Sequence, residues 1–178
     1  MIRIAVIFSL LLSVEAVACP KLVGTWRSSQ VLSLEYNLKN VEMEPHTIKF
    51  MRDVFGVLTL TYTKNAIRMH GAPTKKITIK GKEHDFVYEE MTFSYEIKSC
   101  TKNSLIILSD SPYSTGEDVL NFINPNVYWV PSMPGSEKRE YFERLPKDIY
   151  QACQKSLHYV ALDVADAPPF IWALNVRF

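Results

Sequence analysis

The sequence has almost no excess of charge of either sign and little glycine, and both shortages narrow the classes of protein to consider. Its 20 Lys and Arg residues nearly balance its 19 Asp and Glu residues, which leaves a formal net charge of +1. This balance gives no electrostatic reason to expect nucleic acid or an anionic membrane surface as the main partner. The 6 glycines are dispersed along the chain, so neither a phosphate-cradling loop nor a dinucleotide-binding fingerprint is present.

Recognisable catalytic and metal-binding motifs are also missing. The chain contains no His-Glu-x-x-His sequence, and its four histidines are scattered: His46, His70, His84 and His158. The segment Ser99-Cys100-Thr101-Lys102 fits a Ser-x-x-Lys pattern, but it lies at a predicted strand end instead of a helix start. We therefore predict that the protein is not an enzyme and that it uses no metal and no cofactor.

Aromatic residues, by contrast, are abundant. The chain of 178 residues has 9 Phe, 9 Tyr and 3 Trp, which is more than a minimal core needs. Hydrophobic residues at 47% and charged residues at 22% are typical of globular proteins, and the length favours a single domain. The placement of the aromatic residues is therefore the feature that a functional interpretation has to explain.

The first 18 residues have the pattern of a secretory signal peptide. Arg3 supplies an early positive charge, Ile4 to Leu12 form a nearly continuous apolar run, and Ala16-Val17-Ala18 supplies small residues for cleavage. The run is shorter than the roughly 20 apolar residues of a membrane-spanning helix, so a retained anchor is the weaker alternative. We predict an exported protein with three segments: a signal peptide over 1–18, a folded domain over 19–146 and a C-terminal extension over 147–178.

The three cysteines leave alternatives open. Cys19 follows the small-residue site directly, in a context close to a bacterial lipobox, so it is either lipidated or follows a plain cleavage site. Lipidation would anchor the protein to the outer membrane, and plain cleavage would leave it in the periplasm. If Cys19 is lipidated, Cys100 and Cys153 remain as a pair that an oxidising periplasm can join in a disulfide. The alternative is two unpaired buried thiols, because sequence separation does not show distance in space.

Short segments rich in Thr, Val, Ile, Tyr and Phe dominate the chain after residue 56, and turn residues separate most of them. Together with an opening segment at Lys21–Ser28 they predict about nine strands: Val57–Thr63, Ala66–His70, Lys76–Lys80, Phe86–Lys98, Leu105–Ser109, Val119–Ile123, Val127–Val130 and Arg139–Leu145. One helix is predicted between Glu44 and Phe55, where Pro45 fits the first turn. The pattern predicts a mainly β protein, an antiparallel up-and-down β-barrel of about eight to nine strands with one helix inserted after the first strand.

Apolar and polar residues alternate within several of these strands. Phe93, Tyr95 and Ile97 share one strand face, and Leu60 and Tyr62 share a face of another. In an eight-strand barrel the covered face is the interior, which is either filled by side chains or wide enough for one small ligand. Both outcomes are compatible with the sequence.

Three features together resemble the lipocalin-like proteins, in the form of small exported bacterial members. They are Gly24-Thr25-Trp26 on the first strand after a signal peptide, the run of up-and-down strands, and Arg144 on the last barrel strand. Tyr128-Trp129-Val130-Pro131 and Arg139-Glu140-Tyr141-Phe142 stand near the end, as in that group. The resemblance covers residues 21–146. It implies that Trp26 packs at the closed end of the barrel under Arg144, as a structural cation–π plug.

The resemblance also implies non-catalytic binding of a small hydrophobic molecule or lipid in the cell envelope. The residues predicted to contact that ligand are aromatic residues assigned to inward strand faces: Tyr62, Phe93, Tyr95, Phe122 and Trp129.

The C-terminal extension favours two alternative functions. A short helix is predicted at Asp148–Leu157, and apolar residues alternate from Phe170 to the terminal Phe178, as in the closing strand of an outer-membrane β-barrel. One alternative is an envelope interaction module with a filled barrel, which docks a protein partner through its helix or its C-terminal tail. The other is a small outer-membrane β-barrel, which the short strands and their charges disfavour.

Overall fold

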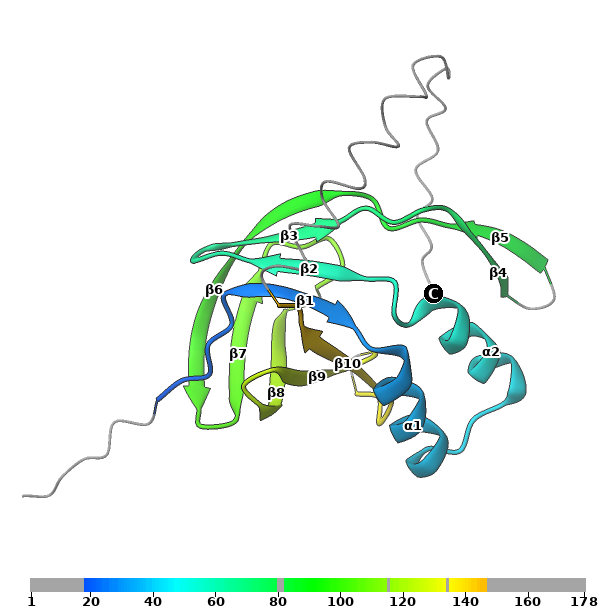
Figure 1. Ribbon diagram of the computed structural model, residues 1–178, viewed down its shortest axis with the longest axis horizontal. Coiled ribbons are helices and arrows are strands. Elements are labelled where there is room, and N and C mark those ends of the chain that lie inside the picture. The colour runs from blue at the N-terminus through cyan, green and yellow to red at the C-terminus, as the bar shows by residue number, and fades with distance from the viewer. Residues whose placement is uncertain (1–17, 80–81, 115, 134, 147–178) are drawn as a thin grey trace, which may run out of the picture.

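Eight antiparallel strands close into a barrel, in the order β1-β10-β9-β8-β7-β6-β3-β2 (Figure 1). The structure is a computed structural model that describes residues 18–146, apart from residues 80–81, 115 and 134. The barrel strands are β1 Gly24–Ser28, β2 Thr59–Tyr62, β3 Ala66–His70, β6 Met91–Thr101, β7 Ser104–Ser109, β8 Glu117–Asn124, β9 Val127–Pro131 and β10 Arg139–Arg144. Two further strands, β4 Lys75–Ile79 and β5 Lys82–Phe86, form a separate two-stranded sheet. Two helices, α1 Gln30–Asn40 and α2 Pro45–Val54, lie between β1 and β2 in the chain.

The predicted up-and-down barrel with a helix after its first strand is confirmed. The segment predicted as one strand at Phe86–Lys98 instead contains the end of β5 and most of β6. The sequence of β5 gave no strand signal because its residues are almost all exposed and need no apolar alternation. The predicted signal peptide, except residue 18, and the whole C-terminal extension with its helix and tail lie outside the described residues.

Helix α1 was missed because its buried side chains are polar. Ser29 caps its N-terminus by accepting a hydrogen bond from the Leu32 N–H at 3.5 Å. Ser33 and Asn37 are fully buried, whereas Val31 and Leu38 are exposed. A search for an apolar stripe at helical spacing therefore finds little in this segment.

Helix α1 covers the part of β10 that β1 leaves unpaired. Strand β1 pairs with β10 only from Phe142 to Arg144. Beyond that point, the Ser33 hydroxyl accepts a hydrogen bond from the Tyr141 N–H at 2.9 Å. The Asn37 amide accepts from the Arg139 N–H at 3.0 Å and donates to the Arg139 carbonyl at 2.7 Å. These side chains satisfy a buried strand edge that would otherwise lack partners.

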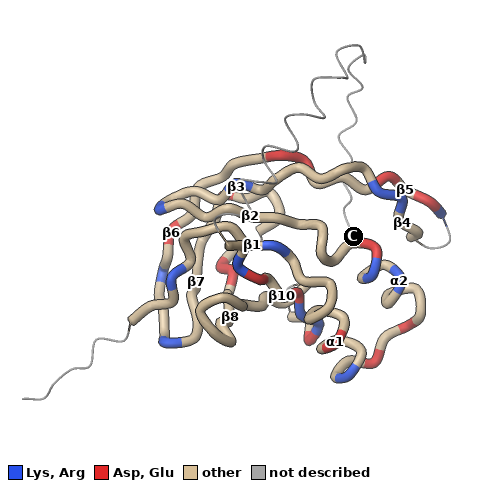
Figure 2. Tube along the Cα trace, in the orientation of Figure 1, with Lys and Arg blue, Asp and Glu red and all other residues tan. Residues whose placement is uncertain are grey.

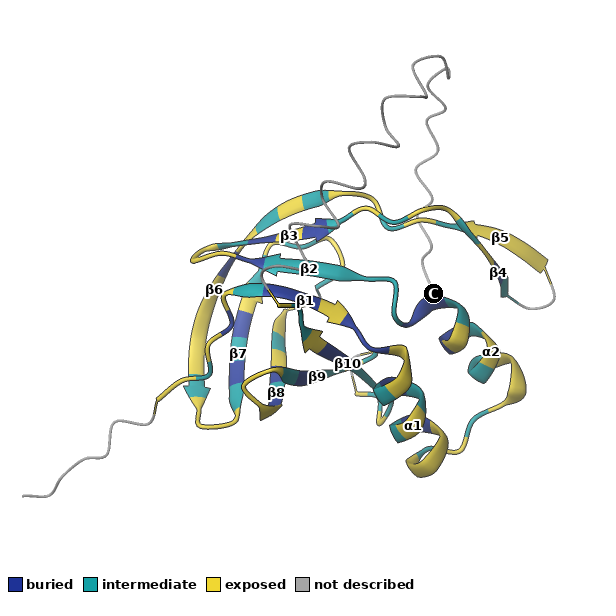
Figure 3. Ribbon diagram, in the orientation of Figure 1, coloured by how far each residue is buried: buried dark blue, intermediate teal, exposed yellow. Residues whose placement is uncertain are grey.

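The β4–β5 hairpin leaves the barrel and packs on α2, on the side where both helices lie (Figures 1 and 3). Ile77 on β4 is buried, as are Met51 and Val54 on α2. Lys75 Nζ donates to the Asp53 carbonyl at 2.6 Å, and Lys49 Nζ donates to the Thr78 hydroxyl at 3.0 Å. A small apolar contact between α2 and β4, together with hydrogen bonds from two lysines, therefore holds the hairpin beside the barrel.

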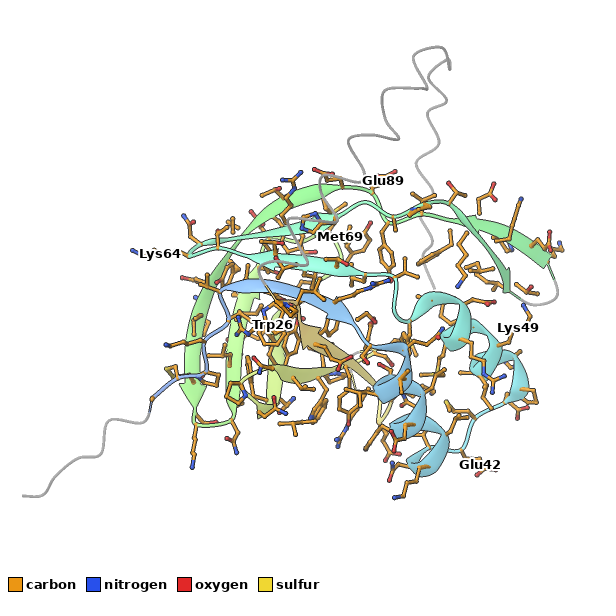
Figure 4. All side chains as sticks on the ribbon, in the orientation of Figure 1. Trp26, Glu42, Lys49, Lys64, Met69 and Glu89 are labelled. Atoms are coloured by element: carbon orange, nitrogen blue, oxygen red, sulfur yellow. A yellow bond between two sulfur atoms is a disulfide. The ribbon has the colours of Figure 1, made fainter. Side chains whose placement is uncertain are left out.

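Trp26 is the centre of the closed end, and no part of its side chain is exposed (Figure 4). The Arg144 guanidinium carbon lies 4.1 Å from the centroid of the Trp26 ring, which is the predicted plug geometry. Arg144 also donates to the Val23 carbonyl at 2.7 Å and to the Lys21 carbonyl. The Trp26 indole N–H donates to the Leu22 carbonyl at 2.8 Å, so the pair fixes the incoming N-terminal segment on the last strand.

The disulfide differs from the predicted pairing. Cys19 is joined to Cys100, with a Cα–Cα distance of 5.6 Å, and Cys153 lies outside the described residues. A β-bulge between Ile97 and Ser99 shifts the register of β6, which places Cys100 against the core. The prediction that Cys100 pairs with Cys153 is therefore wrong. The disulfide also occupies the sulfur atom of Cys19 that lipidation would use, so the structure does not agree with a lipidated Cys19.

Candidate functional site

The structure has two hollows that are candidate sites. One, of about 730 Å³, lies outside the barrel at its closed end, beside Cys19, Asn124 and Arg144. The other, of about 520 Å³, is lined by residues of seven barrel strands and of the loops at one end of the barrel. The second is the candidate site, because most of its apolar wall residues are core residues or residues that pack against the core.

Alternation along the strands builds the cavity walls. Leu58 and Leu60 pack partly buried against the core, and Tyr62 on β2 is fully within it. Ile67 and Met69 extend this wall from the neighbouring strand β3, where they pair with Tyr62 and Leu60, and Met69 is labelled in Figure 4. The remaining apolar and aromatic wall residues are Phe93, Ile107, Val119, Leu120, Tyr128, Val130 and Phe142. Such a wall excludes water from a ligand and offers it dispersion contacts.

A layer of aromatic rings separates this cavity from the closed end. The rings of Tyr128 and Phe142 stack with centroids 5.0 Å apart, and the Tyr128 ring meets Trp26 edge-on at 4.8 Å. The hydroxyls of Tyr62 and Tyr128 lie 3.3 Å apart in a hydrogen bond. Burial raises the pKa of both tyrosines well above the usual value, so both stay neutral. The cavity floor is therefore apolar with one hydroxyl pair.

Glu140 on β10 supplies a partly buried carboxyl group to the cavity wall. Ser28 Oγ donates to Glu140 Oε1 at 2.5 Å and accepts from the Gly56 N–H at 2.9 Å. Burial raises the pKa of Glu140 from 4.5 to about 7, although the hydrogen bond from Ser28 acts in the opposite direction. Glu140 thus has a carboxyl group that is close to half ionised at neutral pH and is tied to the start of the β1–β2 connection.

Two more carboxylates line the cavity from β8. Asp118 accepts a hydrogen bond from the Ser114 hydroxyl at 3.0 Å, and burial raises the pKa of Asp118 above its usual value. Glu117 also lines the cavity and is exposed. Among the described lining residues there is no Lys, Arg or His. Negative charge inside the barrel therefore has no basic counterpart on the cavity wall.

The cavity opens between loops at one end of the barrel. Tyr113 and Met133 contribute to the lining and are 68% and 54% exposed, so they stand at the mouth. Tyr88, in the segment between β5 and β6, lies near them: burial, and then the charges of Glu140 and Tyr113, raise its pKa well above the usual value. Large side chains at the mouth give a ligand further apolar contact as it enters.

The predicted ligand residues divide into three groups in the structure. Tyr62 and Phe93 line the cavity. Tyr95 and Phe122 belong to the core but do not line the cavity. Trp129 is on the outer face of β9, where the Arg139 guanidinium carbon lies 3.8 Å from its ring centroid. The assignment of Trp129 to the inward strand face is wrong, because the inward residue is its neighbour Tyr128, a one-residue shift that exchanges strand faces.

Two residues that sequence reasoning missed are Tyr128 and Glu140. Tyr128 lies in the segment 128–131 and Glu140 in the segment 139–142, but a charged residue on a predicted strand is expected to face solvent. In register, Glu140 pairs with Val130 and Phe142 pairs with Tyr128. These pairs share one side of the sheet, and only that register shows that the carboxyl faces inward.

The described residues contain no group of three or more His, Cys, Asp or Glu side chains placed to hold a metal ion. Acidic and basic residues are interspersed over the trace (Figure 2). Within the described part of the chain, no helix has the length and apolar character needed to cross a membrane.

Comparison with known proteins gives no match: no family model, no curated protein and no solved structure matches this chain.

Proposed function

We propose that this protein binds a small apolar molecule inside its barrel, without catalysis. The observation that carries the proposal is the cavity of about 520 Å³ between apolar strand faces. This volume lies within the usual range of small-molecule sites, roughly 300 to 1,000 Å³. A barrel that served only as a filled scaffold would place side chains in that space.

The lipocalin-like resemblance is part of the proposal. It is supported by the closed eight-strand barrel and by the stacking of Arg144 on Trp26 at the closed end. It is also supported by the position of the cavity above that plug, where a ligand would contact Tyr62 and Phe93.

We place the protein in the cell envelope, in the periplasm. The support is the Cys19–Cys100 disulfide, because disulfides persist in oxidising compartments. The outer-membrane barrel is not proposed, because Arg27, Arg68 and Glu96 are exposed on the outer faces of their strands, and charge facing lipid is costly. The docking alternative rests mainly on residues 147–178, outside the described residues.

The test is binding of a neutral apolar dye, N-phenyl-1-naphthylamine, whose fluorescence rises in a dry site. We expect saturable binding to the purified full chain. The variant Val130→Trp places a large ring in the cavity, and we expect it to weaken dye binding by about tenfold or more. A matched control is Leu108→Trp, on the exposed outer face of β7 and outside the cavity lining.

Circular dichroism of both variants verifies that they fold. Absence of saturable dye binding to the wild-type protein would contradict the proposal, as would equal weakening by the two tryptophan variants. Native mass spectrometry of the protein purified without detergent gives an independent measurement, because a copurifying ligand adds its mass.

A further inference from the structure

The charges on the cavity wall are all of one sign. Glu117, Asp118 and Glu140 line the cavity, and its described lining holds no basic residue. An apolar pocket intended for a fatty acid or another anionic amphiphile would place a cation at the headgroup, because an unpaired buried charge is costly. The observed walls would repel a carboxylate.

We infer that the cavity selects apolar molecules that carry a protonated amine, with Glu140 holding the ammonium group and Asp118 adding negative potential. This inference rests on the proposed function and names the chemical class of its ligand. The apolar part of the molecule would lie along Leu60, Met69 and Val130, and the amine would lie against the β8–β10 wall.

Glu140 has the geometry to accept a hydrogen bond from such a group. Its residue is not exposed, and the hydrogen bond from Ser28 occupies Oε1. Oε2 remains to accept from a ligand, since the described contacts give it no partner. Ser28 is itself fixed by the Gly56 N–H. The carboxyl is therefore positioned before a ligand arrives, which reduces the ordering cost of binding.

Aromatic rings elsewhere in the cavity lining add attraction for a cation. Tyr128 and Phe142 line the same cavity and stack on one another, and Tyr62 lies beside them. Their rings attract cations through the negative faces of their π systems. Since burial keeps both tyrosines protonated, they add no competing negative charge.

The experiment compares three molecules with the same chain and different headgroups: decylamine, decanol and decanoate. Each displaces the neutral dye from the full-length protein at about pH 8, where the amine is protonated and the acid ionised. We expect decylamine to bind at least about tenfold more tightly than decanol, since a hydrogen bond to a charged group contributes about 1.5 to 3 kcal/mol. Decanoate should bind most weakly.

The variant Glu140→Gln keeps the size of the side chain and removes its charge. We expect the ratio of decylamine to decanol affinity to fall by about tenfold in this variant, and by less in Asp118→Asn. The matched control is Glu143→Gln, which removes a carboxylate from the exposed face of the same strand and should leave the ratio unchanged. Using a ratio within each variant separates headgroup recognition from general loss of affinity.

The wild-type series alone can overturn the inference, whether or not a variant folds. Decanol or decanoate binding as tightly as decylamine would show that the carboxylates do not select a cation, while dye displacement would leave the proposed function standing. If the dye itself does not bind, the proposed function fails and the inference fails with it.

Discussion

Asn37 on α1 makes two hydrogen bonds to the backbone of a single residue of β10, Arg139. Its amide donates to the Arg139 carbonyl at 2.7 Å and accepts from the Arg139 N–H at 3.0 Å. The Arg139 side chain then lies between two aromatic rings, 4.1 Å from the centroid of Tyr36 and 3.8 Å from that of Trp129. The buried Asn37 amide thus supplies the two hydrogen bonds to the Arg139 backbone that a neighbouring strand would otherwise supply.

We expect Asn37→Ala to destabilise the protein by about 2 to 4 kcal/mol, because two buried backbone groups lose their partners. The measurement is urea unfolding followed by circular dichroism. Asn40→Ala is the control on the same helix, since Asn40 is exposed and its amide donates to the Tyr36 carbonyl within that helix. A cost for Asn37→Ala no larger than that of Asn40→Ala would show that α1 does not complete the edge of β10.

The raised pKa of Glu140 predicts a pH dependence of stability. Between about pH 4.5 and pH 7 the folded protein holds a proton that the unfolded chain has released. This contribution to the free energy of unfolding is therefore complete below pH 4.5, falls as pH rises through the window, and is lost above about pH 7. The full change corresponds to about 3 kcal/mol.

We expect Glu140→Gln to remove most of this slope, because the amide does not titrate. Urea midpoints measured across the pH window give the result. Asp118, whose pKa burial also raises, contributes a slope of the same sign that persists in the variant, and Tyr88 and Tyr128 beside Glu140 stay neutral throughout. A slope identical to that of the wild type and of Glu143→Gln would contradict the assignment.

Gly24 is required where Arg144 crosses the first strand. Its φ is +140°, and a Cβ at this position would lie 2.5 Å from Arg144 Nη1. We expect Gly24→Ala to cost about 2 to 4 kcal/mol, from backbone strain and displacement of Arg144 from the Trp26 ring. Gly116→Ala is the control, since its φ is +148° with nothing within 4 Å. If Gly24→Ala and Gly116→Ala lower the free energy of unfolding in urea by the same amount, the Arg144 contact adds nothing to the backbone strain.

The Cys19–Cys100 disulfide predicts both a chemical and a thermodynamic result. Alkylation without reduction, followed by peptide mass spectrometry, should show these two residues linked. Because the bond joins residues 81 apart, the double variant with both cysteines changed to Ser should lose about 4 to 5 kcal/mol in the chain-entropy model. A diacylglycerol on Cys19, or a peptide linking Cys100 to Cys153, would contradict the pairing.

Local patterns in the sequence predicted the barrel well. Alternation of residues such as Leu60 and Tyr62, with turns between short strands, gave most strand positions. Pro45 and helical spacing gave α2. These features depend on neighbours within a few residues, so they can be seen without the fold. The resemblance to lipocalin-like proteins added one long-range contact, Arg144 on Trp26, which the structure contains.

Features that depend on register or on distant partners could not be found in this way. The inward carboxyl of Glu140, the outward ring of Trp129 and the disulfide between Cys19 and Cys100 each follow from how strands align or where a bulge falls. A shift of one residue exchanges the two faces of a strand, and one bulge does the same along its remainder.

The sequence by itself determined a small barrel with one apolar face per strand, because alternation is a local property of the chain. Only the tertiary structure decided that the barrel keeps a cavity and that Glu140 and Asp118 stand in its wall. The reason is that the cavity and its charges arise from residues brought together from seven strands, β2, β3, β6, β7, β8, β9 and β10, and no local pattern contains the relative register of these strands.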